Sequence, residues 1–176
     1  MPYSVDDKLV VAVASSALFD LTKSNQVYEC QGTAAYRLYQ RQHEGETLGP
    51  GVAFPFVKRL LSLNQLDSVP AVEVVLLSRN DSDTGLRVMN SIAGHELPIS
   101  RAAFLGGDDP YKYIRPFRAC LFLSASQRDV EEAGMQGLPA GRVLACDYID
   151  DVDDPELRIA FDFDGVLISD DAERVF

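Results

Sequence analysis

Short apolar runs alternate with amphipathic stretches along most of this chain. Residues 9–14 and 72–77 are almost continuously aliphatic, which is the pattern of strands that are covered on both faces. Two shorter apolar runs, at 101–104 and 119–123, predict further strands. A last segment, 142–146, follows the final predicted helix.

The segments between these runs have apolar residues at helical spacing. Helices are expected at 24–42, 53–63 and 84–92, with a short helix at 109–115 and the start of another at 129–133. Strands that alternate with helices imply right-handed crossovers, a mostly parallel sheet and ligands at the carboxyl ends of the strands. The expected fold class is therefore α/β, with a doubly wound, mostly parallel sheet.

Composition limits the size and the partners of this unit. A chain of 176 residues with 47% hydrophobic content is long enough for one domain with a sizeable core. Its 27 acidic and 16 basic residues give a net charge of -11, which argues against binding to nucleic acid or to an anionic membrane. No apolar segment approaches the roughly 18 residues of a membrane span, and the acidic start lacks the basic residues of a signal peptide. A cytoplasmic location is expected, with Cys30, Cys120 and Cys146 as buried, reduced thiols.

The two ends of the chain resemble each other. Residues 11–28 and 159–176 align without a gap, each with an apolar strand, small or acidic positions and the start of a helix. The alignment pairs Ala14 with Asp162 and Ser16 with Asp164, so the first copy lacks the two acids; chance similarity is the alternative. We therefore expect a first α/β repeat at 1–146, an acidic connector at 147–156 and the start of a second repeat at 157–176. The connector lacks the spacing and the glycine of an EF-hand calcium loop.

The strongest chemical signal is the sequence Asp-Phe-Asp-Gly-Val-Leu at 162–167, directly after an apolar approach at 157–161. Two carboxylates two residues apart at the end of a strand, followed by glycine, can approach one phosphate and one metal ion. Hard oxygen ligands of this kind suit Mg²⁺. A strand end with two solvated aspartates and a turn glycine is the alternative interpretation.

This hexapeptide resembles the first motif of the haloacid dehalogenase superfamily. The resemblance implies that Asp162 is a nucleophile that forms an aspartyl phosphate, and that Asp164 is the general acid and base. It also implies a Mg²⁺ ion bound by Asp162 and by the backbone carbonyl of Asp164. Ser78, at the end of the run 72–77, resembles the phosphate-binding serine of the second motif, and Lys112 resembles the lysine of the third motif.

Over nearly the whole chain the sequence is similar to the cytosolic 5′-nucleotidase I family, which implies a nucleoside 5′-monophosphate substrate. Two features depart from that family. Serines stand at 124 and 126, where the fourth motif is normally acidic, and family members continue past the DxD motif with a further repeat that carries their functional motifs. Ser78 and Lys112 are therefore either vestigial or act with Asp162 and Asp164 in a permuted single site.

Two other functions remain open at this point. One is a catalytically weak nucleotide-binding or assembly module, and the other is a phosphatase for another small phosphate ester. The apolar strand at 157–161 and 166–168 needs a neighbour, because an unpaired edge is adhesive. We expect it to join the sheet of its own chain and bring Asp162 toward Ser78; pairing with a second copy, which would give a homodimer, is the alternative. His43 and His95 are assigned no role.

Overall fold

Five parallel strands form the centre of the fold, in the order β3-β2-β1-β4-β5. The computed structural model describes residues 5, 7–145, 150–151 and 154–162. The strands are β1 (Leu9–Ala14), β2 (Val72–Ser78), β3 (Arg101–Phe104), β4 (Leu121–Ser124) and β5 (Ala140–Arg142). The predicted fold class, a doubly wound α/β unit with a parallel sheet, is confirmed by this order.

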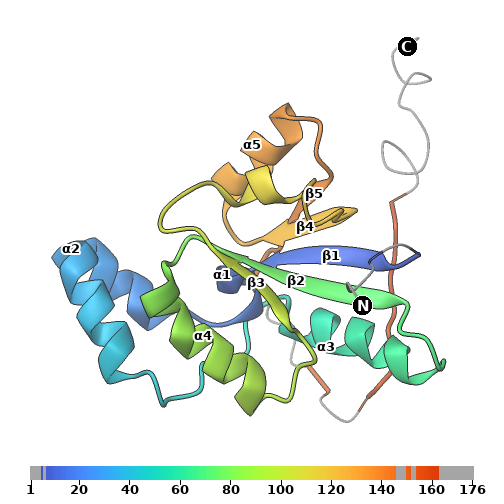
Figure 1. Ribbon diagram of the computed structural model, residues 1–176, viewed down its shortest axis with the longest axis horizontal. Helices are drawn as coiled ribbons and strands as arrows, with labels where there is room; N and C mark the ends of the chain where they lie inside the picture. The colour runs from blue at the N-terminus through green and yellow to red at the C-terminus, as the bar shows by residue number, and fades with distance from the viewer. Residues whose placement is uncertain (1–4, 6, 146–149, 152–153, 163–176) are drawn as a thin grey trace.

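Helices connect the strands and cover the sheet. They are α1 (Ser15–Leu18), α2 (Thr22–Gln42), α3 (Phe54–Ser62), α4 (Ser82–Gly94) and α5 (Gln127–Met135), with 3-10 turns at Leu63–Gln65 and Pro110–Tyr113. Figure 1 shows α5 on one side of the sheet and α3 and α4 on the other. The chain extends from β1 to β2 and β3 in one direction and then returns past β1 to β4 and β5. Right-handed crossovers in opposite directions place helices on opposite faces, as observed.

The core consists of the two central strands and the helices packed on them. All seven residues of β2 are buried, as are five of the six residues of β1. Val57, Leu60 and Leu61 supply the apolar face of α3. The aliphatic runs therefore became central strands because both of their faces are covered by other elements.

Some predicted elements differ in detail from the structure. The helix expected at 24–42 begins at Thr22 and is interrupted at Gly32, whose backbone φ of 80° is not helical. The helix expected at 109–115 is a short 3-10 turn, and the last strand lies at Ala140–Arg142 instead of in the segment 142–146. The expectation of buried thiols is wrong for Cys30 and Cys120, which are exposed and free; Cys146 lies outside the described residues.

The predicted strand at 157–161 is not present. Residues 154–162 have no regular secondary structure, and the side chains of Ile159 and Phe161 are 51% and 65% exposed. The expected addition of this strand to the sheet of its own chain is therefore wrong for residues 157–162, while residues 163–168 lie outside the described part of the chain. Arg59 of α3 contacts the connector, donating hydrogen bonds to the carbonyls of Asp151 and Asp154. Pairing with a second copy stays a prediction.

Within the described ranges, no helix combines the length and the apolar character needed to span a bilayer.

Candidate functional site

The carboxyl ends of β1, β2 and β4 meet at the point where the strand order reverses. In doubly wound sheets this reversal opens a crevice in which ligands bind. Here Ser15 and Ser16 follow β1, Ser78 ends β2 and Ser124 ends β4. The predicted phosphate-binding serine, Ser78, therefore ends a strand beside the crevice, but it is buried and is not among the residues that line the cavities there.

Two buried hydroxyls face each other across β1 and β2. Ser15 Oγ and Ser78 Oγ are 3.0 Å apart, and the backbone amide of Asn80 donates to Ser78 Oγ at 3.2 Å. Ser78 is 1% exposed and Ser15 is 6% exposed. The Ser78 hydroxyl therefore joins the ends of the two central strands and orders the turn that leads into α4.

Ser124 and Ser126 organise the next strand end in a similar way. The amide of Ser126 donates to Ser124 Oγ at 3.1 Å, and the amide of Asp129 donates to Ser126 Oγ at 3.3 Å, which caps α5. Ser124 Oγ lies 3.4 Å from the carboxylate of Asp129. These serines stabilise the helix start, and their hydroxyls supply no negative charge for a metal ion.

Arg79 is the central charge of the crevice. Its guanidinium pairs with Asp129, lies 2.9 Å from Asp109 Oδ1 and donates to the carbonyl of Gly107 at 3.3 Å. Burial by itself would lower the pKa of Arg79, but the hydrogen bonds and charges of Asp129 and Asp109 outweigh burial and raise the pKa above its usual value. Arg79 thus remains a cation whose charge is already balanced by two carboxylates.

The predicted lysine, Lys112, lies on the outer side of this cluster. Its Nζ atom is 3.7 Å from Asp108 Oδ1 and 3.8 Å from Asp109 Oδ2, and its side chain is 50% exposed. Asp109 therefore stands between Lys112 and Arg79, and among the described residues this carboxylate links Lys112 to the crevice.

The structure does not bring Asp162 to the crevice. Asp162 is exposed and has no regular secondary structure, and Asp164 lies outside the described residues. In Figure 1 the segment 154–161 runs past the side of the sheet where β1 and β2 begin, opposite to the side where they end. The expected approach of Asp162 to Ser78 is therefore not seen.

The described residues of the crevice do not fit a Mg²⁺ ion. Position 14, which the repeat pairs with Asp162, is an alanine, and position 16, paired with Asp164, is a serine. Asp129 is the acid that lines the inner crevice, and Arg79 neutralises it. Across the described ranges, no group of three His, Cys, Asp or Glu side chains is arranged to hold a metal ion.

Two adjoining cavities occupy the crevice. The inner cavity, of about 240 Å³, is lined by Ala14, Ser15, Ser16 and Asp129 among others. The outer cavity, of about 480 Å³, extends between α2 and the loop after β3, where its lining includes Tyr28, Arg37 and the glycines at 106 and 107. Both cavities share four residues: Asn25, Tyr36, Arg79 and Asn80.

A chain of hydrogen bonds reaches Asn80 from the interior. Arg87 Nη1 donates to Gln40 Oε1 at 3.2 Å, Gln40 Nε2 donates to the Tyr36 hydroxyl at 3.0 Å, and that hydroxyl donates to Asn80 Oδ1 at 2.7 Å. Burial raises the pKa of the Tyr36 phenol above its usual value, although the hydrogen bonds with Gln40 and Asn80 act in the opposite direction. Tyr36 is thus a protonated donor at neutral pH.

The sequence analysis missed the four residues shared by the cavities. Asn80 and Arg79 directly follow Ser78, and polar residues after a buried strand are a signal that could have marked them. Tyr36 lies on a helix 44 positions away from Asn80 along the chain, so local sequence gives no sign of their contact.

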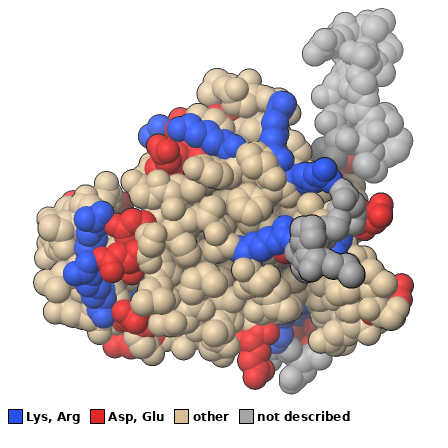
Figure 2. Space-filling model, in the orientation of Figure 1, with Lys and Arg blue, Asp and Glu red and all other residues tan. Residues whose placement is uncertain are grey.

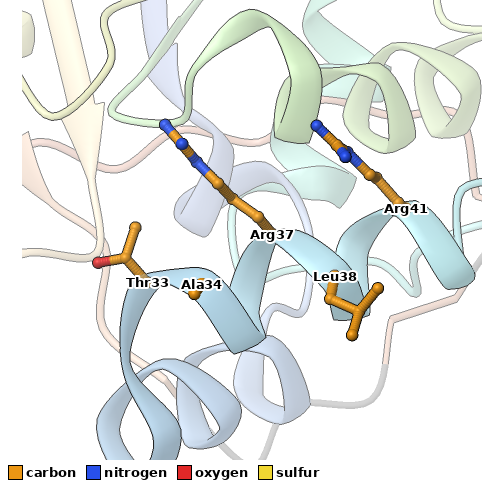
Figure 3. A pocket seen from close by; sticks show the side chains of 5 residues that line it. All are labelled: Thr33, Ala34, Arg37, Leu38 and Arg41. Atoms are coloured by element: carbon orange, nitrogen blue, oxygen red, sulfur yellow. The ribbon is translucent and has the colours of Figure 1, made fainter.

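The outer side of α2 carries charge pairs with α4. Arg37 Nη2 lies 2.5 Å from Asp81 Oδ2, and Arg41 pairs with Asp83. Figure 3 shows both arginines extending from α2 toward α4, beside a hollow that is also lined by Thr33, Ala34 and Leu38. In Figure 2 basic and acidic side chains lie next to each other over this part of the surface. The positive charges here are matched by negative ones, so this hollow offers no net charge to a ligand.

Three comparisons relate the chain to known proteins. A family model described as 5′-nucleotidase matches residues 1–176. Human cytosolic 5′-nucleotidase 1B is 33% identical over 181 aligned residues, which are 98% of this chain and 29% of that protein. The chain thus spans less than a third of the length of this relative. The HAD domain of the effector protein Lem4 from Legionella pneumophila superposes on 77% of this chain and 84% of its own, with a TM-score of 0.44 and 14% identity.

Proposed function

Because the chain belongs to the 5′-nucleotidase family, we propose that it acts in the hydrolysis of nucleoside 5′-monophosphates to nucleosides and phosphate. The observation that carries this proposal is the segment Asp-Phe-Asp-Gly at 162–165, which lies inside the matched region and resembles the first motif of the haloacid dehalogenase superfamily. The hexapeptide alone left phosphatases for other phosphate esters open, and the family match favours nucleotides.

The proposed reaction has two steps at these carboxylates. A carboxylate oxygen of Asp162 attacks phosphorus, and the bond between phosphorus and the ribose 5′-oxygen breaks while Asp164 protonates that oxygen. Asp164 then takes a proton from water, the resulting hydroxide attacks the phosphorus of the aspartyl phosphate, and phosphate leaves with Asp162 regenerated. A bound Mg²⁺ ion would offset the charge of the phosphate, with Asp162 and the carbonyl of Asp164 as the ligands that the family resemblance implies.

The first repeat has a different role in this proposal. Its positions equivalent to the two acids are Ala14 and Ser16, and its fourth-motif serines, Ser124 and Ser126, hold the start of α5. These contacts favour a non-hydrolytic binding or assembly function for the crevice as the second candidate. We place the protein in the cytoplasm, in line with the name of its human relative. We also propose that two copies of the chain can associate through residues 157–168.

A phosphate-release assay tests this function. The full chain is incubated with a panel of nucleoside 5′-monophosphates, with Mg²⁺ and with a chelator, next to the variants Asp162→Asn and Asp67→Asn. Asp67 is an exposed carboxylate whose side chain, within the described part of the chain, accepts hydrogen bonds from the neighbouring Ser68 alone, so it is the matched control. We expect Mg²⁺-dependent release that Asp162→Asn abolishes and Asp67→Asn retains. An inactive wild-type chain, or an Asp162→Asn variant with wild-type turnover, contradicts the proposal.

A further inference from the structure

The Asn80 side chain ends in a hydrogen-bond donor that has no acceptor. Its Nδ2 atom is buried and makes no hydrogen bond to any described residue, although Asn80 lines both cavities of the crevice. A buried donor without a partner typically costs about 1–3 kcal/mol. Such a group therefore marks a place where a ligand can supply what the protein lacks.

The direction of this amide is fixed by its neighbours. A guanidinium can only donate, so Arg87 requires Gln40 to present its oxygen to Arg87 and its nitrogen to Tyr36. The Tyr36 hydroxyl accepts that bond and donates to the oxygen of Asn80. Arg87 itself is 7% exposed and is held by the carbonyl of Glu46 at 3.1 Å, so the chain starts from a fixed cation. Asn80 therefore presents its amino group, and the ligand must present an acceptor.

The walls of the outer cavity suit a flat aromatic ligand. The rings of Tyr28 and Tyr36 meet edge to face, with centroids 6.0 Å apart, and Tyr28 is 53% exposed. On another side of the cavity lie Gly106 and Gly107, which leave open space where side chains would stand. A volume of about 480 Å³ lies within the range of about 300–1,000 Å³ that is usual for small-molecule pockets.

The charges in the crevice favour an uncharged ligand group. Arg37 pairs with Asp81, and Arg79 pairs with Asp129 and Asp109. A phosphate placed here would be repelled by these three carboxylates, and the two arginines that pair with them are not free to neutralise it. A neutral ring would not be repelled.

We propose that the outer cavity binds the base of a nucleoside, with a ring nitrogen or carbonyl oxygen of the base accepting a hydrogen bond from Asn80 Nδ2. The choice of a nucleoside over another flat heterocycle rests on the proposed function. Binding at this site is non-hydrolytic, because Ala14 and Ser16 supply no carboxylate at the end of β1. Because Nδ2 is shielded from solvent, this proposal requires the cavity lining to open when the base enters.

Calorimetric titration of the full chain, in the presence of a chelator, tests the site. The probes are adenosine, inosine and uridine, with ribose 5-phosphate as a probe that has a phosphate but no base. At least one nucleoside is expected to bind, and ribose 5-phosphate is not. Absence of nucleoside binding, or binding of ribose 5-phosphate with equal affinity, overturns the proposal.

Variants of the amide show whether Asn80 is responsible. Asn80→Asp keeps the acceptor for Tyr36 and removes both donors, so nucleoside affinity should fall by about tenfold. Asn90→Asp makes the same chemical change on the exposed side of α4 and should leave the affinity unchanged. Tyr36→Phe is a second variant, which frees the amide to rotate and should also weaken binding. Thermal unfolding of each variant verifies the fold, and equal affinity in the Asn80 and Asn90 variants contradicts the proposal.

The outcome is separable from that of the phosphate-release assay. Nucleoside binding is measured without Mg²⁺ and should persist in the Asp162→Asn variant. If the chain binds a nucleoside through Asn80 but releases no phosphate, the proposed hydrolysis is rejected and the cavity assignment stands. If the chain releases phosphate but binds no nucleoside in the chelator titration, the cavity assignment is rejected and the proposed hydrolysis stands.

Discussion

The hydroxyls of Ser15 and Ser78 lie 3.0 Å apart, across the carboxyl ends of β1 and β2. The contact joins residues 63 positions apart in sequence, and Ser78 also accepts a hydrogen bond from the amide of Asn80. It therefore couples the two central strands to the turn that presents Asn80 to the cavities.

Replacement of Ser78 by alanine should destabilise the fold. The change leaves the Asn80 amide and the Ser15 hydroxyl without their partner, and each buried unsatisfied group costs about 1–3 kcal/mol. Urea denaturation should show a loss in this range for Ser78→Ala and little change for Ser100→Ala, which alters an exposed serine just before β3. Equal stability of the two variants would show that the hydroxyl pair contributes nothing.

The Tyr36 phenol should ionise at a higher pH than an ordinary tyrosine. Burial raises its pKa above the ordinary value of 10.0, so the unfolded chain loses this proton before the folded chain does. The stability that depends on the neutral phenol is complete below pH 10.0 and is lost as the pH rises from there through the folded pKa. Alkaline titration of tyrosinate absorbance in the wild type and in Tyr36→Phe should differ by one late-titrating group. If the two titration curves differ instead by a group that ionises at the ordinary tyrosine pKa, Tyr36 is not buried as described.

Gly51 should tolerate no side chain. A Cβ atom there would lie 2.6 Å from the carbonyl oxygen of Ala17 and 2.7 Å from the amide nitrogen of Phe19. Both are backbone atoms in the segment that follows β1, so no side-chain rotation relieves the clash. Gly51→Ala should cost about 1–3 kcal/mol or more of unfolding free energy. Gly49→Ala, two residues earlier with open space around the site, is the control and should change stability little.

The sequence predicted the central strands well and the crevice only in part. The aliphatic run at 72–77 is typical of a strand covered on both faces, and β2 was found there. The contact between Tyr36 and Asn80 depends on how α2 packs beside β2, and no local pattern encodes it. Gly32 shows a similar limit, because apolar residues at helical spacing on both sides of it conceal the interruption of α2.

The position of Asp162 was the least predictable feature. The pattern at 157–161 resembles a strand, yet its described residues lie outside the sheet and expose Phe161. Whether such a segment pairs with an edge strand of the sheet depends on where the connector places it. Arg59 contacts the connector across more than 90 positions of sequence, and spacing along the chain cannot reveal this contact.

Arg59 should therefore control the order of the connector. Its side chain is 14% exposed, its Nη1 lies 2.8 Å from Asp150 Oδ1, and it donates to the carbonyls of Asp151 at 2.8 Å and Asp154 at 2.9 Å. Arg59→Ala removes the ion pair and both hydrogen bonds, and a hydrogen bond that involves a charged group contributes about 1.5–3 kcal/mol. Amide hydrogen exchange in 150–161 should accelerate by tenfold or more, while exchange in β2 stays unchanged.

Arg59→Lys is the matched variant for this prediction, because lysine keeps the charge but lacks the planar fork that reaches several acceptors at once. It should preserve the ion pair with Asp150 and lose at least one carbonyl contact, so its exchange rates should fall between those of the wild type and of Arg59→Ala. Lys58→Ala removes a neighbouring exposed cation from α3 and should leave exchange in 150–161 at the wild-type rate. If amide hydrogen exchange in 150–161 is unchanged in Arg59→Ala, contacts other than those of Arg59 hold the connector and the prediction is wrong.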